Sequence, residues 1–80
     1  MPNVFTWNGN RFHFFANEGN PREPLHVHVS RAGATAKFWL YPELQLAYNR
    51  GYDAREIKQV EAIVRKRRDE IEDKWNDFFA

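Results

Sequence analysis

Residues 25–29, with the sequence Leu-His-Val-His-Val, alternate strictly between apolar and imidazole side chains. Successive side chains of a β-strand point to opposite faces of its sheet. The pattern therefore predicts a half-buried strand in which Leu25, Val27 and Val29 face the core and both histidines, His26 and His28, face away from it. A chain that contains this strand must fold around a sheet with one covered face.

Four further segments complete the predicted sheet. Residues 4–7 and 11–15 flank Asn8-Gly9, a dipeptide typical of two-residue β-hairpin turns. Residues 35–41 alternate like the central strand, and residues 44–48 indicate a fifth strand, although their leucine and alanine residues also suit a helical turn. The side chains from these segments that we expect on the core face are Phe12, Phe14, Phe38, Leu40, Leu44 and Leu46.

Residues 53–80 predict a single long helix. Asp53 and Glu56 have the spacing of a capping box, apolar residues recur every three or four positions, and neither Gly nor Pro occurs in residues 54–80. About 25 helical residues extend roughly 38 Å, whereas a strand of five or six residues covers only ~17–20 Å. The last turns should therefore overhang the sheet and need cover from another chain or a folded-back N-terminus. The predicted partner interface consists of Trp75, Phe78 and Phe79.

These elements indicate one α+β domain over residues 1–80. An antiparallel sheet of four to five strands, starting with a β-hairpin, occupies residues 1–52, and one long C-terminal helix, residues 53–80, packs on one face. The net charge of +1 provides no general attraction for nucleic acid, and the absence of Cys excludes disulfides, thiolate metal sites and a Cys nucleophile. With no secretory signal and no apolar run near the roughly 20 residues of a membrane span, we expect a cytoplasmic protein without membrane association.

The face opposite the helix carries the candidate site. His26 and His28 titrate near neutral pH and are candidates for general acid–base catalysis on RNA. Imidazoles are also common metal ligands, and a third ligand would come from Glu18, Glu23 or His13. Histidines that simply hydrogen-bond to loop backbone are an equally supported alternative, so no metal and no other cofactor is predicted.

Cationic and aromatic side chains near these histidines predict a nucleic-acid or ligand face, because aromatic rings stack on bases and cations neutralise phosphates. An ordinary solvated sheet face is the favoured alternative. In the basic run 65–68, we expect the stems of Arg67 and Arg68 to cover core aromatics while their charges pair with the acidic residues that follow. The predicted face consists of Arg11, His13, Arg22, Arg31, Lys37 and Trp39.

The order of these motifs resembles a bacterial family known as domain of unknown function 4160 (DUF4160). The resemblance covers nearly the whole chain and is carried by the strand around His26 and His28, the sequence Ala-Lys-Phe-Trp at residues 36–39, and Arg-Gly-Tyr at residues 50–52. Family members more often carry an aromatic residue where His13 stands.

That family has no settled activity, but its members resemble components of toxin–antitoxin-type pairs and are often encoded beside another small uncharacterised protein. The resemblance therefore implies a binding component that docks a small cognate protein encoded nearby, with RNA or DNA as a further ligand. The overhanging C-terminal helix, for its part, predicts self-association or partner binding, and therefore a homo- or hetero-oligomer. The alternatives are a ribonuclease-like toxin that uses His26 and His28, and a small histidine-based metal-binding protein.

Overall fold

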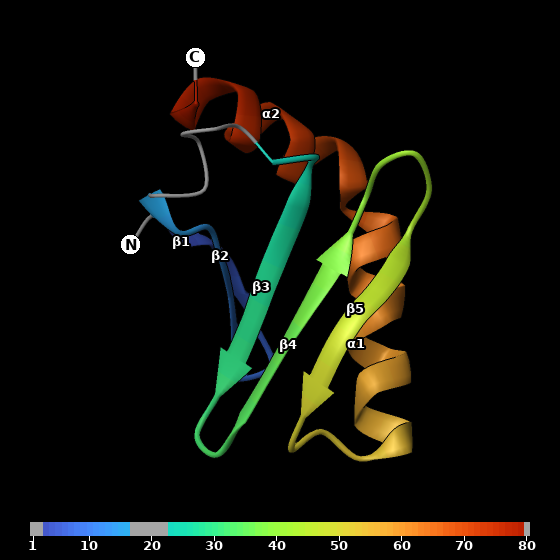
Figure 1. Ribbon diagram of the computed structural model, residues 1–80. Helices are drawn as coiled ribbons and strands as arrows, with labels where there is room; N and C mark the ends of the chain where they lie inside the picture. The colour runs from blue at the N-terminus through green and yellow to red at the C-terminus, as the bar shows by residue number, and fades with distance from the viewer. Residues whose placement is uncertain (1–2, 17–22, 80) are drawn as a thin grey trace.

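The computed structural model describes residues 3–16 and 23–79 of the chain. Its five strands form one antiparallel sheet in which neighbours in sequence are neighbours in space, and two helices follow (Figure 1). The α+β class and the antiparallel sheet are thereby confirmed. The elements are β1 (Asn3–Trp7), β2 (Asn10–His13), β3 (His26–Arg31), β4 (Ala34–Trp39), β5 (Gln45–Arg50), α1 (Ala54–Lys66) and α2 (Arg68–Phe78).

The local sequence signals explain where the first strands and the first helix begin. Asn8 and Gly9 both have positive φ angles, +50° and +80°, as a two-residue turn between right-twisted strands requires. Asp53 caps α1: its side chain accepts a hydrogen bond from the Glu56 amide at 2.7 Å, and the Glu56 carboxylate accepts one from the Asp53 amide at 3.2 Å. The predicted hairpin and capping box are both present.

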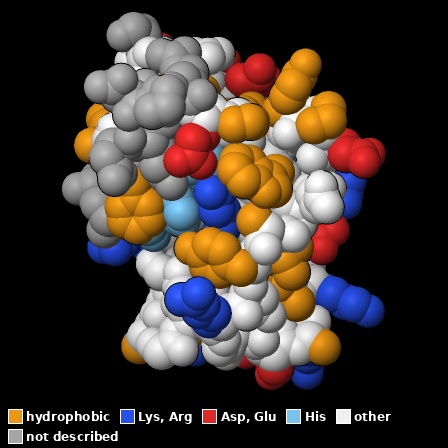
Figure 2. Space-filling view, viewed as in Figure 1, with side chains coloured by type: hydrophobic (Ala, Val, Ile, Leu, Met, Phe, Trp, Pro, Cys, Tyr) orange, Lys and Arg blue, Asp and Glu red, His pale blue; other side chains and the backbone are white. Residues whose placement is uncertain are grey.

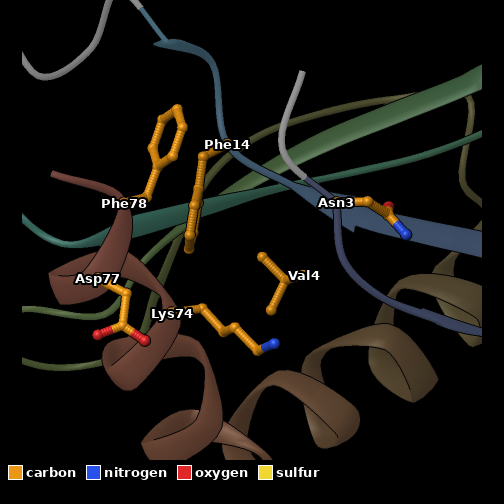
Figure 3. Close-up of a pocket in the computed structure, with 6 residues that line it drawn as sticks. All are labelled: Asn3, Val4, Phe14, Lys74, Asp77 and Phe78. Atoms are coloured by element: carbon orange, nitrogen blue, oxygen red, sulfur yellow. The ribbon is translucent and has the colours of Figure 1, made fainter.

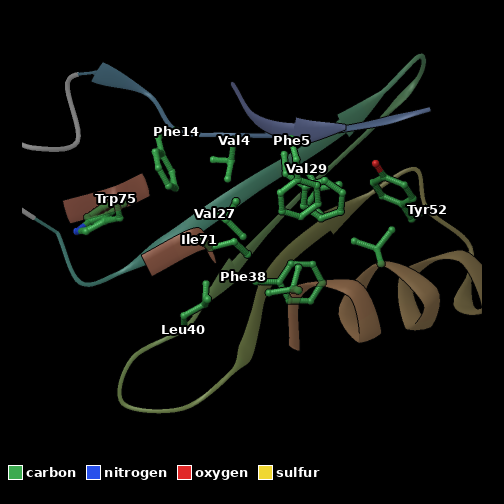
Figure 4. Close-up of a cluster of buried hydrophobic side chains, with 14 of the residues drawn as sticks. Val4, Phe5, Phe14, Val27, Val29, Phe38, Leu40, Tyr52, Ile71 and Trp75 are labelled. Atoms are coloured by element: carbon green, nitrogen blue, oxygen red, sulfur yellow. The ribbon is translucent and has the colours of Figure 1, made fainter. Parts of the chain in front are cut away.

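The core lies between one face of the sheet and the two helices (Figure 4). Val27 and Val29 on β3 are fully buried there, as strand alternation predicts, and His26 and His28 project from the opposite face. The other fully buried apolar side chains of the described residues come from strands, loops and helices alike: Phe12, Phe14, Ala36, Phe38, Leu40, Val60, Val64 and Ile71.

The C-terminal segment forms two helices, so the prediction of one long helix was wrong. The backbone leaves the helical conformation at Arg67 (φ −107°, ψ 25°), between α1 and α2. Hydrogen bonds continue through the bend, from the Arg67 amide to Ile63 O at 2.9 Å and from the Ile71 amide to Arg67 O at 3.1 Å. The bend lets Ile71 and Trp75 pack onto the sheet, where they are buried. Burial of two large apolar side chains outweighs the small cost of one irregular residue.

The charges of Arg67 and Arg68, at the bend, pair with acidic residues that follow them, as expected. The Arg67 guanidinium lies 3.6 Å from the centre of the Phe5 ring and donates hydrogen bonds to Glu70 at 2.9 and 3.0 Å. Arg68 donates to Glu72 at 3.1 Å and to the Leu40 carbonyl at 3.2 Å. Both charges therefore serve internal contacts.

A bulge in β5 changes which face its side chains occupy. Lys37 pairs with Tyr48 and Phe38 pairs with Leu46, so Ala47 is an extra residue on the edge strand. Tyr48 consequently joins the histidine face. Leu46 stays on the core side, opposite Phe38, but on this edge strand it is 40% exposed and not buried in the core as predicted. Leu44 is only partly buried against the core. None of the helices in the described ranges combines the length and the apolar character that crossing a membrane requires.

Candidate functional site

Rows of side chains cross the sheet on the face opposite α1, which we call the histidine face. The strand register places His13, His28, Lys37 and Tyr48 side by side on β2, β3, β4 and β5. The His13 and His28 rings are stacked, with their centres 5.7 Å apart and their planes 21° from parallel. The neighbouring row pairs His26 with Trp39. The structure thus brings together five of the residues that the sequence singled out: His13, His26, His28, Lys37 and Trp39.

The three histidines are nevertheless buried. The exposed fractions of His13, His26 and His28 are 3%, 0% and 4%. In Figure 2 only a small area of histidine side chain is visible, beside hydrophobic and cationic side chains. A substrate would reach these rings only after other side chains had moved, so their burial favours a packing role. The catalytic assignment of His26 and His28 remains a prediction.

Each ring is held by a hydrogen bond and by aromatic neighbours. His26 Nδ1 lies 2.8 Å from Pro24 O, and His13 Nε2 lies 3.2 Å from Ser30 Oγ. His28 Nδ1 lies 3.4 Å from the Tyr48 hydroxyl. These contacts orient the rings and connect the central strand to its neighbours and to the edge of the sheet.

His26 also connects the histidine face to the C-terminal helix. Its ring centre lies 5.2 Å from that of Trp39 and 4.9 Å from that of Trp75, in edge-to-face arrangements. This geometry is a common one for packed aromatic rings. His26 therefore acts as part of the support for α2.

The predicted nucleic-acid face is divided in the structure. Lys37 is mostly buried, lies 4.1 Å from the Trp39 ring and 3.4 Å from Glu23 Oε1, and so has an acidic partner. Arg31 lies on the helix side, where it forms an ion pair with Glu56. Arg11 is exposed on the histidine face, and Arg22 lies outside the described residues. Arg31 and His28 are three positions apart on one strand, so alternation places their side chains on opposite faces. This separation could have been predicted from the sequence.

Metal binding by this face has little geometric support. His26 Nδ1, which lies 4.0 Å from Glu23 Oε1, is already only 2.8 Å from Pro24 O. Within residues 3–16 and 23–79, no group of three His, Asp or Glu side chains is arranged to hold a metal ion. Glu18, another proposed ligand, lies outside the described residues.

A polar network that the sequence did not reveal joins the β1–β2 turn to the start of α1. The Tyr52 hydroxyl donates a buried hydrogen bond of 2.8 Å to Asn10 Oδ1, and the Arg31 guanidinium lies 5.1 Å from the Tyr52 ring centre. Burial raises the pKa of Tyr52, Arg31 lowers it and Glu56 raises it. The Asn49 side chain accepts from the Tyr52 amide at 3.1 Å and donates to its carbonyl at 3.0 Å. These bonds fix the passage from sheet to helix.

The predicted partner interface is mostly internal. Trp75 and Phe79 are 4% and 9% exposed and pack against Phe14, with ring centres 5.2 and 6.1 Å away. Only Phe78 remains exposed, at 42%. The overhang expected of Trp75 and Phe79 is absent because the bend at Arg67 turns α2 onto the sheet.

Phe78 lines a pocket between β1 and α2, which we call the Phe78 pocket (Figure 3). Its volume is about 320 Å³. Val4, Phe14 and Phe78 supply apolar surface, and α2 adds one positive and one negative side chain. The residues that line it are Asn3, Val4, Phe14, Lys74, Asp77 and Phe78. A pocket of this kind can receive an apolar side chain with polar groups on either side.

Comparison with known proteins gives one match. The family model DUF4160, described as a domain of unknown function, matches residues 9–76. No curated protein and no solved structure matches the chain.

Proposed function

The chain belongs to the DUF4160 family, a domain of unknown function, and we propose from its surface that it is a binding module for a small protein partner. The Phe78 pocket is the docking site. The observation that carries the proposal is the exposure of Phe78, at 42%, beside three buried aromatic rings, Phe14, Trp75 and Phe79. A large exposed ring at the mouth of a pocket is typical of an interface anchor.

The lining of the pocket defines the chemistry of the partner. An aliphatic or aromatic side chain would fill the space beside Val4 and Phe14. Lys74 and Asp77 lie at exposed positions of the pocket and would pair with charges of opposite sign on the partner. In addition, β1 is an edge strand of the sheet, so a partner strand can add to its outer side.

Burial of the histidines also favours binding over catalysis. A ribonuclease mechanism would need His26 and His28 to reach a phosphodiester, yet both rings are covered. A docking module needs only an accessible surface for its partner, and its histidines can remain buried. We therefore propose a non-catalytic component of a toxin–antitoxin-type pair, whose partner is the small protein encoded beside it.

The test is a binding titration with the product of the adjacent gene. Both proteins are purified after separate expression, and their affinity is measured by isothermal titration calorimetry. We expect Phe78→Asp to weaken binding by about 30-fold or more, the loss typical of a central aromatic anchor. Lys74→Glu should also weaken binding and should do so less at high salt, because surface ion pairs are screened.

Tyr41 provides the matched control. It is 65% exposed and does not line the pocket, so Tyr41→Asp makes the same aromatic-to-acid change elsewhere on the surface and should leave the affinity unchanged. Circular dichroism would confirm that each variant is folded. Unchanged affinity in folded Phe78→Asp, or equal losses in the two aspartate variants, would contradict the proposed docking site.

A further inference from the structure

The opposite edge of the sheet is an exposed strand, β5. β5 is the last strand in the sheet order, and all six of its residues are exposed. Two of the four large exposed hydrophobic side chains within the described residues lie on this strand, on opposite faces of the sheet: Leu46 at 40% and Tyr48 at 36%. Arg50 is the only charged residue of β5. The strand contains no Pro, Lys or acidic residue that would discourage pairing with another strand.

We propose that β5 pairs antiparallel with β5 of a second copy of this chain, centred on Asn49. In a two-fold symmetric contact, each residue pair occurs twice, with the roles of the two copies exchanged. With Asn49 opposite Asn49 of the second copy, Tyr48 stands opposite Arg50 of that copy. The reciprocal Arg50–Tyr48 pair completes the contact.

The side chains in this register are suited to each other. Tyr48 pairs with Lys37 and Arg50 with Thr35, so both lie on the histidine face. Arg50 already lies 5.5 Å from the Tyr48 ring centre within one chain, which shows that the guanidinium can approach this ring. Side chains directly opposite each other on paired strands lie about 4.5–5.5 Å apart at Cβ, within range of a cation–π contact.

The fold accommodates the second copy. Figure 1 shows β5 at the free edge of the sheet, with α1 behind the sheet. A two-fold axis perpendicular to the sheet would keep both copies of α1 on one side and join the two histidine faces on the other. The net charge of +1 per chain produces little repulsion between copies. Only residues after the bulge at Ala47 pair regularly, so the contact is short and the dimer should form at micromolar concentrations.

The first test is the mass of the full chain from 1 to 200 µM by sedimentation velocity, with these concentrations chosen on the order of the expected affinity. We expect the mass to rise from 9.6 kDa toward twice that value. Tyr48→Lys places two positive charges opposite each other and should raise the dissociation constant at least about tenfold. Tyr41→Lys adds the same charge outside the paired residues and should leave it unchanged. A wild-type chain that remains monomeric would overturn the proposal, as would equal effects of the two lysine variants.

The second test uses the absence of native cysteine to read the register. Asn49→Cys removes the side-chain hydrogen bonds to Tyr52, so its fold is first checked by circular dichroism. In the folded variant the two thiols would be opposite each other, with Cα atoms about 4.5–5.5 Å apart, a spacing that permits a disulfide. In Gln45→Cys the two thiols would be eight positions out of register, about 27 Å apart along the strand. Mild oxidation should therefore cross-link the first variant and not the second. Cross-linking of Gln45→Cys alone, or of neither variant at dimer-forming concentration, would contradict the pairing around Asn49.

Discussion

Replacement of Trp75 by alanine tests whether α2 packs on the sheet. The Trp75 ring is 4% exposed and its centre lies 5.2 Å from the Phe14 ring, 4.9 Å from His26 and 4.3 Å from Phe79. Truncation of such a buried ring removes apolar burial and leaves a cavity, at a cost of about 3–5 kcal/mol. Domains of this size have total stabilities on the order of 4–12 kcal/mol. Trp75→Ala should therefore remove about a quarter or more of the free energy of unfolding.

Phe78→Ala is the matched control in the same helical turn. Phe78 is 42% exposed, so its truncation should cost about 1 kcal/mol or less. Urea unfolding of both variants would be followed by far-UV circular dichroism. Fluorescence is unsuitable because Trp75→Ala removes one of the fluorescent side chains. The midpoint should fall strongly only for Trp75→Ala, with the slope unchanged. Its melting temperature should fall by at least about 12 °C.

A straight helix that overhangs the sheet makes a different prediction. Both rings would then be exposed, and both substitutions would cost little. Two small and similar losses of stability would refute the packing of α2 and the shape of the Phe78 pocket. A large loss confined to Trp75→Ala would support the bent arrangement.

Two further predictions concern the passage from β5 to α1. Gly51 has φ +100°, and a Cβ there would lie 2.4 Å from Gly33 O. Gly51→Ala should therefore destabilise the protein by about 2 kcal/mol or more, measured by thermal unfolding. Gly9 has φ +80° but open space around it, so Gly9→Ala should cost less. Because burial raises the pKa of Tyr52 above 10.0, the unfolded chain loses this proton at a lower pH than the folded chain. The folded state therefore binds more protons, and stability should fall as the pH rises above about 10. Tyr52→Phe should show a smaller decrease in urea-unfolding experiments at alkaline pH, and an equal decrease would contradict the assigned cause.

Much of the sheet could be predicted because strand alternation is a strictly local rule. The buried Val27 and Val29 and the opposite direction of His26 and His28 follow from it directly. The side on which a residue lies does not, however, fix its exposure. His26 is fully buried because Trp39 and Trp75 cover it, and contacts of this kind depend on the tertiary fold.

The bulge and the bend could not be predicted in the same way. Ala47 has no side-chain feature that distinguishes a bulge from an ordinary strand position, yet the extra residue moves Tyr48 to the histidine face. Arg67 is a good helix former, and no Gly or Pro accompanies it. The helix bends there because packing of distant apolar residues stabilises the bent form, which a helical periodicity count does not measure.

Helical geometry explains why one aromatic residue of α2 remains available for a partner. Successive residues of an α-helix are separated by about 100°, so Trp75 and Phe79 lie only about 40° apart on one side. Phe78 lies about 60° from Trp75 in the other direction and about 100° from Phe79. When the bend turns the first two residues onto Phe14, Phe78 is left at the border of the buried face, 42% exposed. The bend therefore both removes the predicted overhang and creates the pocket in which Phe78 meets β1.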